Sequence, residues 1–195
     1  MIIGIAGKAR SGKGTIASHI MTRYSFAEDK FSTPIVKVLS DVFMIDEKIA
    51  LDEAGRENPL VDWPGWTVRS MMQTVATKMR EMDTLVFVKA MEKRLRLRLD
   101  NLEFMPFIPN IVIHDIRMPN ERDLLKQKFG AVIFKVVRDS TGPVGLAGHE
   151  TESQNISADF IFPNNGSIET LLKMVDTVMQ EELKILPSVT TTRRS

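Results

Sequence analysis

The chain has 195 residues, 43% of them apolar, which is enough for one good core in a single domain. Its 26 Lys and Arg balance 25 Asp and Glu, so the charge indicates no nucleic-acid polymer as a partner. The absence of cysteine excludes a disulfide framework and a thiolate metal site. Since the first apolar run starts at Ile2 and no run is as long as a bilayer span, we expect neither a signal peptide nor a membrane helix. These features predict a soluble cytoplasmic protein with no membrane partner.

The stretch 2–20 carries the strongest signal in the chain. Residues 2–6 form a short, isoleucine-rich run that predicts a buried strand, and apolar residues recur with helical spacing from Ile16. The loop between them is Gly7-Lys8-Ala9-Arg10-Ser11-Gly12-Lys13-Gly14-Thr15. Its glycines let the backbone curl so that N–H groups and the positive end of the next helix meet an oligophosphate, which Lys13 would also reach. The loop predicts a phosphate-binding site; the alternative is a glycine-rich turn without a ligand.

The hydroxyl of this loop is displaced by one position. The usual P-loop pattern has Ser or Thr directly after the lysine, where the hydroxyl meets magnesium, whereas here Gly14 follows and Thr15 comes next. Gly-Lys-Gly-Thr at 12–15 resembles the loop of adenylate kinase and its nucleoside monophosphate kinase relatives. The displaced hydroxyl therefore narrows the prediction to P-loop proteins of this kind.

The next elements are less distinctive. We expect a first helix over 12–23, short extended pieces at 25–26 and 30–31 around Glu28-Asp29, and a second helix with Pro34 at its first position. Lys37 lies off the apolar stripe of that second helix, where an exposed lysine is ordinary. Residues 46–64 are polar and poorly periodic.

Both tryptophans lie together ahead of a third helix. Trp63 and Trp66 flank a Pro-Gly turn, and Thr67 would cap the helix that follows. Arg69, Gln73 and Arg80 lie off the buried stripe of this helix. Two interpretations stay open: the indoles plug the edge of the core, or they form a pocket for a flat base together with the polar residues.

A second strong signal is the β-branched run at 111–115, which ends in Asp115. Strand ends in parallel sheets open onto the crevice where a triphosphate lies, so Asp115 is our candidate for the Walker B carboxylate that orders hydrated magnesium. Arg117 follows at once. A further buried strand over 131–137 ends at Arg138, again on the side of the crevice.

The remaining segments complete an alternation of strands and helices. Residues 85–102 are apolar and basic, and their length and the segment Ala90-Met91-Glu92 favour a helix. The basic run at 93–99 predicts a solvated face of that helix rather than a phosphate-backbone contact, because no aromatic residues are interleaved with it and the overall charge is balanced. Helices are also expected over 119–129 and 168–183, with a last strand over 158–162. The loop at 139–155 is either a lid that excludes water or a disordered surface excursion. The alternation predicts an α/β fold: a parallel sheet of five strands with helices on both faces.

Five blocks of sequence, in this order, look like the phage-type deoxynucleoside monophosphate kinases. They are GKARSGK at 7–13, FSTPIVK at 31–37, VRSMMQT at 68–74, DIRMPNE at 115–121 and NNGS at 164–167. The resemblance spans nearly the whole chain. It implies a three-layer P-loop kinase fold as a single domain over 1–195, with an acceptor-binding insertion at about 46–105 and a lid loop at about 139–155.

The resemblance implies an ATP-dependent nucleoside monophosphate kinase, a phosphotransferase with a phosphate acceptor. The enzyme would transfer the γ-phosphoryl group of ATP to a deoxynucleoside 5′-monophosphate, giving a dNDP and ADP for DNA synthesis. It would use magnesium (Mg2+) and act as a homodimer in the cytoplasm of an infected bacterium.

Carried over by position, the resemblance assigns roles to individual residues. Lys13, Arg117, Arg138 and Asp115 would be catalytic, with Asp115 ordering magnesium and the two arginines clamping the transferring group. Thr15 and Asp115 would hold the metal through water. The residues on ATP would be Gly7, Arg10, Ser11, Gly12, Lys13, Gly14 and Thr15, with Asn165 and Gly166 bordering the adenine. The residues on the acceptor would be Lys37, Trp63, Trp66, Arg69 and Gln73.

The chain departs from the family pattern in two respects. The family usually has Asp where Gly14 stands, and this chain is short for the family. Two other functions therefore stay open. A dephospho-coenzyme A kinase would share the loop and Asp115 without needing the tryptophan turn, and a non-catalytic ATP-binding module would bind ATP without acceptor-dependent ADP release.

Overall fold

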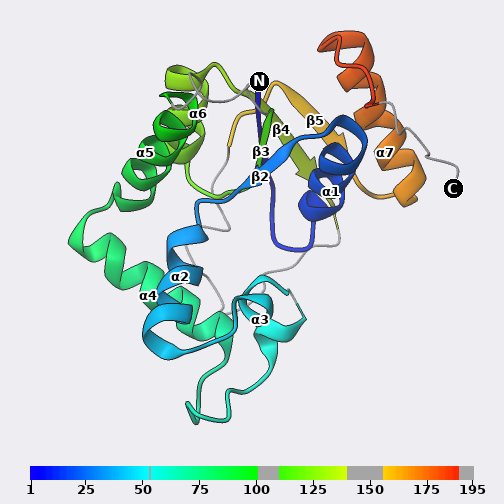
Figure 1. Cartoon of the computed structure of the whole chain (residues 1–195). Coiled ribbons are helices and arrows are strands. Elements are labelled where there is room, and N and C mark those ends of the chain that lie inside the picture. The colour runs from blue at the N-terminus through cyan, green and yellow to red at the C-terminus, as the bar shows by residue number, and fades with distance from the viewer. Residues whose placement is uncertain (53, 101–109, 140–155, 189–195) are drawn as a thin grey trace, which may run out of the picture.

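The computed structural model describes residues 1–52, 54–100, 110–139 and 156–188 of the chain. Within these ranges a single sheet of five parallel strands has the order β2-β3-β1-β4-β5 (Figure 1). The strands are β1 (Ile2–Ala6), β2 (Ala27–Asp29), β3 (Ile111–Ile116), β4 (Val132–Val137) and β5 (Phe160–Pro163). In the register of the central strand, Ile3 lies opposite Val112 of β3 and Val132 of β4. The predicted parallel sheet is confirmed, but β2 lies at Ala27–Asp29, between the extended pieces predicted at 25–26 and 30–31.

Helices cover both faces of this sheet, as predicted, because β1 alternates its side chains between two cores. Ile3 and Ile5 pack in the core of one face, whereas Ile2 and Ala6 belong to the core of the other. The covering helices are α1 (Lys13–Tyr24) and α7 (Ile168–Thr177) on the first face, and α5 (Val86–Asp100) and α6 (Pro119–Phe129) on the second (Figure 1). In this three-layer arrangement, a loop or a helix follows each strand at the carboxyl edge of the sheet.

The chain between β2 and β3 builds a helical region beyond one end of the sheet (Figure 1). It contains α2 (Thr33–Phe43), α3 (Glu47–Leu51), the 3₁₀ turn η1 (Gly55–Glu57) and α4 (Val68–Met82), and it leads back to the sheet through α5. The poorly periodic stretch 46–64 thus holds two short elements. Asp46 caps α3 by accepting the N–H of Lys48. With only five residues, α3 is too short for its apolar periodicity to predict a helix.

Local sequence signals mark where three of the longer helices begin or end. At the start of α4, the Thr67 hydroxyl accepts the N–H of Ser70, and the Ser70 hydroxyl accepts the N–H of Thr67. Pro34 is the second residue of α2, one position later than predicted, because the helix begins at Thr33. Gly130, with φ 61°, closes α6 in the left-handed conformation.

The C-terminal part differs from the prediction in two places. Strand β5 covers Phe160–Pro163 rather than 158–162. The helix predicted over 168–183 ends at Thr177, and the chain continues as a π-helical turn, η4 (Val178–Glu182). Both helix types put apolar residues on one side, so the spacing does not tell them apart. The predicted lid falls outside the described residues except for Asp139. The helix predicted over 85–102 is described over Val86–Asp100, and its last two predicted residues lie outside the described residues.

None of the helices in the described ranges combines the length and the apolar composition that a membrane span requires.

Candidate active site

The loop between β1 and α1 leaves the carboxyl end of the central strand and turns sharply. A β-carbon at Gly7 would lie 2.5 Å from the backbone oxygen of Val136, and one at Gly12 would lie 2.5 Å from Nδ2 of Asn164. Gly12 also has φ 109°, a conformation that other residues rarely adopt. The two glycines therefore let the loop pass close to β4 and to the start of α7. Asn164 fixes this approach by donating from Nδ2 to the Ser11 carbonyl at 2.7 Å.

Lys13 is the first residue of α1, and its ammonium group turns back over the loop. Nζ donates to the carbonyls of Gly7 at 2.9 Å and Lys8 at 2.6 Å. The next residue, Gly14, has open space around it, since a β-carbon there would meet no atom within 4 Å. Thr15 follows with an exposed side chain. The loop thus presents a cation, a hydroxyl and the start of a helix to one space, the arrangement that binds phosphate.

That space is a cavity of about 730 Å³ at the carboxyl ends of β1, β3 and β4. From the loop and strand ends it is lined by predicted residues: Arg10, Gly12, Lys13, Gly14, Thr15, Asp115, Arg117, Arg138 and Gly166. From α4 it is lined by Arg69 and Gln73. The lining contains eight Lys and Arg side chains and only two carboxylates, in a chain whose net charge is +1. Such a concentration of positive charge suits polyanionic ligands.

Asp115 joins β3 to the start of α2. Its Oδ1 accepts the N–H of Phe31 at 2.8 Å, and its Oδ2 accepts the N–H of Ser32 at 2.9 Å. Each carboxylate oxygen can accept further hydrogen bonds. The two amides orient the carboxylate at the strand end and leave lone pairs available to the cavity, a geometry compatible with holding water around a metal ion.

Arg69 lies at the opposite wall of the cavity, in the first turn of α4. Its Nε pairs with Oε1 of Glu57 at 2.5 Å, and the residue is only 9% exposed. Its Nη2 is buried with no hydrogen-bond partner among the described residues. A buried guanidinium nitrogen without a partner is costly in a protein that binds nothing there, so this atom indicates a place for a ligand oxygen.

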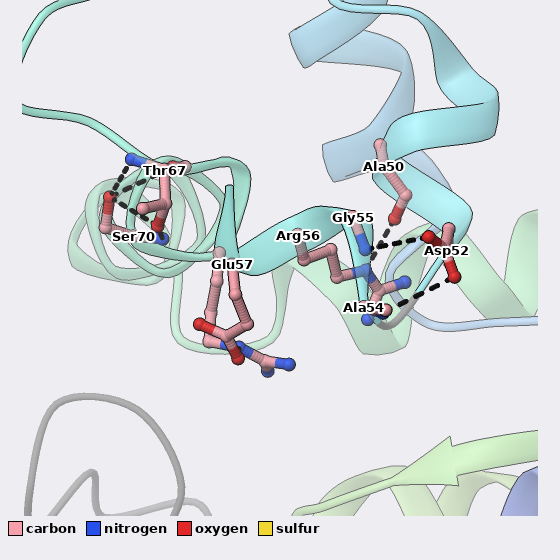
Figure 2. Close-up of polar contacts among 9 residues, drawn as sticks. Ala50, Asp52, Ala54, Gly55, Arg56, Glu57, Thr67 and Ser70 are labelled. Atoms are coloured by element: carbon pink, nitrogen blue, oxygen red, sulfur yellow. Dashed lines mark hydrogen bonds and ion pairs between the residues drawn. The ribbon is translucent and has the colours of Figure 1, made fainter. Parts of the chain in front are cut away.

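The turn η1 supports this wall through its own hydrogen bonds (Figure 2). Asp52 accepts the N–H of Gly55 at 2.7 Å, and Arg56 donates from Nε to the Ala50 carbonyl at 2.6 Å. Arg56 also lines the cavity, and the neighbouring Glu57 holds Arg69. Sequence inspection did not assign Arg56 to the site; its place depends on this short turn.

Six of the predicted residues lie outside the cavity lining. Gly7 and Ser11 belong to the loop beneath it. Asn165 exchanges hydrogen bonds with Asp139, and Lys37 is 66% exposed in its side chain, 3.7 Å from the carboxylate of Glu47. Their assignment to ligands stays a prediction.

The tryptophan turn also lies away from the lining. Trp63 donates from its indole N–H to the Phe43 carbonyl at 3.2 Å and packs against the Phe43 ring edge to face. Trp63 and Trp66 are 37% and 38% exposed. This packing corresponds to the first of the two open interpretations, with the indoles at the edge of the folded region, and contact with a base stays a prediction.

Two further charged residues of the cavity received no assigned role from the sequence: Glu121 was not considered, and Arg80 was named only beside the predicted base pocket. Glu121, in the first turn of α6, is 3% exposed and accepts the N–H groups of Arg117 at 2.8 Å and Met118 at 3.1 Å. Burial raises the pKa of Glu121 to about 7, and the Asp115 carboxylate acts in the same direction. Arg80 of α4 lies 3.8 Å from Glu121. An acidic residue at the third position of a helix is the available signal, and it predicts a cap rather than a place in a cavity.

His114 and Lys30 form the rim beside the edge strand β2. His114 contacts the Glu28 carboxylate at 2.6 Å, and Lys30 lies 3.0 Å from the same oxygen. The hydrogen bond from His114 lowers the pKa of Glu28 to about 2, against the opposing effect of its burial. His114 and Lys30 both line the cavity.

A parallel α/β sheet with a glycine-bounded loop after its first strand, a lysine on the following helix and a cationic cavity at the strand ends defines a P-loop kinase. Residues 56–175 match the family model "Deoxynucleotide monophosphate kinase". A protein of Acanthamoeba polyphaga mimivirus named "Putative deoxynucleotide monophosphate kinase" is 30% identical over 182 residues, covering 90% of this chain and 94% of that protein. The chain belongs to the deoxynucleotide monophosphate kinase family.

The fold has a likeness among solved structures as well. A sugar kinase from Janibacter sp. HTCC2649 superimposes with a TM-score of 0.51 over 94% of both chains, at 15% sequence identity. This likeness concerns the fold alone. Family and fold together support a nucleotide kinase role for the chain.

Proposed function

We propose that this protein transfers the γ-phosphoryl group of ATP to a deoxynucleoside 5′-monophosphate, giving a dNDP and ADP. The observation that carries the proposal is that one cavity contains both the phosphate-binding loop with Lys13 and the buried Arg69 of α4. A donor and an acceptor phosphate can therefore meet in one space. Membership of the family favours a nucleotide acceptor over dephospho-coenzyme A.

On the donor side, Lys13 and the N–H groups at the start of α1 would bind the ATP phosphates, with Arg10 nearby. Gly166 lines the cavity, and with Asn165 it would border the adenine. Magnesium would be held through water by Thr15 and Asp115, which both supply oxygen to the cavity, the ligand type that this ion prefers. When bound, it would neutralise charge on the β- and γ-phosphates.

The chemistry asks for little beyond positioning and charge neutralisation. The acceptor phosphate is already ionised, so the attacking oxygen needs no strong base. Arg117 and Arg138 would clamp the transferring group from the ends of β3 and β4, in line between donor and acceptor. The acceptor-binding region at 46–105, the lid at 139–155 and the homodimer remain part of the proposal.

On the acceptor side, Arg69→Ala is expected to raise the KM for the deoxynucleoside monophosphate about tenfold to a hundredfold while the KM for ATP changes little. Hydrogen bonds to charged groups contribute about 1.5–3 kcal/mol, and the buried Nη2 would supply such a bond. The measurement is steady-state kinetics with each substrate varied in turn. Lys78→Ala is the matched control, because Lys78 lies on the same helix and is 69% exposed in an ion pair with Glu81. An equal rise in both KM values for Arg69→Ala would contradict the assignment.

The decisive experiment is a coupled assay of ADP release from Mg-ATP, with each deoxynucleoside monophosphate added singly. Release that depends on one or more of them is the expected result and identifies the acceptor. Dephospho-coenzyme A and a reaction without acceptor are the controls. ATP binding without release in the presence of any deoxynucleotide would favour the non-catalytic module, and release with dephospho-coenzyme A alone would favour the other kinase.

A further inference from the structure

Two charged groups from different helices meet in the cavity wall without a role in the scheme above. Arg80 comes from α4, and Glu121 comes from the first turn of α6. Oε1 of Glu121 lies 3.8 Å from Nη2 of Arg80, and both residues line the cavity. The Arg80 guanidinium also lies over the Phe87 ring, with Cζ 4.7 Å from the ring centroid. Arg80 is thus held between an aromatic face and a carboxylate.

The two oxygens of Glu121 serve two parts of the site. Oε2 accepts the N–H groups of Arg117 and Met118, which form the turn between β3 and α6. Oε1 faces Arg80, at the far end of α4 from Arg69. Since Glu121 is 3% exposed, water does not compete for these contacts. A single buried carboxylate therefore connects the backbone of Arg117 to the acceptor-side helix.

Arg80 lies on the same face of α4 as the residues predicted to bind the acceptor. Arg69, Gln73, Ala76 and Arg80 are spaced four, three and four residues apart, so they form one face of the helix, and all four line the cavity. A contact that fixes Arg80 therefore also fixes the rotation of the face that carries Arg69.

We propose that Glu121 is a positioning residue for phosphoryl transfer: it orients Arg117 at the end of β3 and, through Arg80, the face of α4 that holds the acceptor. The inference rests on the proposed function. In this proposal, one carboxylate aligns both Arg117, which clamps the transferring phosphoryl group, and Arg69, which binds the acceptor. Alignment acts on the transition state more than on the binding of ATP, so kcat is the sensitive quantity.

The test is Glu121→Gln, assayed at pH 8 with the deoxynucleotide that serves wild type best. Glutamine keeps the size of the side chain and one acceptor for the backbone N–H groups, but it removes the charge that faces Arg80. We expect kcat to fall roughly tenfold or more, because small misplacements of reacting groups cost about a hundredfold, and the KM for ATP to stay within about twofold. Glu92→Gln is the matched control: Glu92 bridges Arg96 and Lys128, tying α5 to α6 outside the cavity, and its loss should leave kcat unchanged.

A double-mutant cycle separates positioning from a purely structural cap. Arg80→Met keeps an apolar stem over Phe87 and should itself lower kcat. If Glu121 acts through Arg80, the double variant loses less than the product of the two single losses. Arg80→Lys, which retains a cation, should recover part of the loss and gives a reading even if Glu121→Gln does not fold.

The outcomes are distinguishable. A kcat for folded Glu121→Gln within about twofold of wild type, losses that multiply in the double variant, or an equal fall in Glu92→Gln would each overturn the inference while wild-type activity stands. A wild-type protein that releases no ADP with any deoxynucleotide would overturn the proposed function and this inference with it.

Discussion

Replacing Lys13 by alanine is expected to reduce kcat roughly a thousandfold, since the loss of one preorganised phosphate-binding group in a transfer reaction has effects of this order. Nζ is already oriented toward the loop by the carbonyls of Gly7 and Lys8, so little reorganisation is needed when a phosphate binds. The folded state should survive, because Lys13 is the solvent-accessible first residue of α1 and packs no core. The measurement is kcat in the ADP-release assay, together with a thermal melt.

Lys89→Ala provides the control for Lys13→Ala. Lys89 is an exposed lysine on α5 that pairs with Asp83, and its removal takes away the same charge outside the cavity. Turnover in Lys13→Ala that equals the turnover of Lys89→Ala would remove the loop from the mechanism. Near-wild-type binding of ATP combined with a large fall in kcat would place the lysine chiefly on the transition state.

The layers of the fold could be predicted because each element signals its own buried side. In β1, an uninterrupted apolar run predicts a strand buried on both faces, and the structure divides Ile3 and Ile5 from Ile2 and Ala6 between two cores. Thr67 and Gly130 signal helix ends by capping chemistry that needs no tertiary contact. The π-helical turn at Val178–Glu182 could not be predicted, because it differs from an α-helix in hydrogen bonding and scarcely in pattern.

The candidate site likewise contains residues that local motifs predict and residues whose place depends on tertiary packing. The loop with Lys13 and the strand-end residue Asp115 are local motifs, and the strand order brings both to one cavity. The pairing of Arg80 with Glu121 depends on how α4 and α6 approach each other, which neither segment encodes alone. The tryptophans depend on tertiary contacts in the same way: the local pattern does not reveal that Trp63 donates its indole N–H to the Phe43 carbonyl, outside the lining, and contact of this turn with a base stays a prediction.

The stability of the protein is expected to fall between pH 5 and pH 8 because of Glu121. Its pKa is raised from 4.5 to about 7, chiefly by burial, so in this window the folded protein keeps a proton that the unfolded chain has released. A group of this kind contributes stability that is complete below the unfolded pKa and is lost as the pH rises through the folded pKa. The contribution is on the order of 3 kcal/mol, from about 1.4 kcal/mol per unit of pKa difference.

Urea unfolding of wild type and Glu121→Gln at pH 5, 6, 7 and 8 measures this contribution. Because glutamine does not titrate, the free energy of unfolding of the variant should rise relative to wild type by on the order of 3 kcal/mol across the series. Glu28 does not interfere, since its pKa of about 2 lies below the window. Parallel curves for the two proteins would show that the carboxyl titrates normally. The expected divergence would mean that the ionised carboxylate beside Arg80 and Asp115 is retained at a cost in stability, which is typical of a group placed for function rather than for folding.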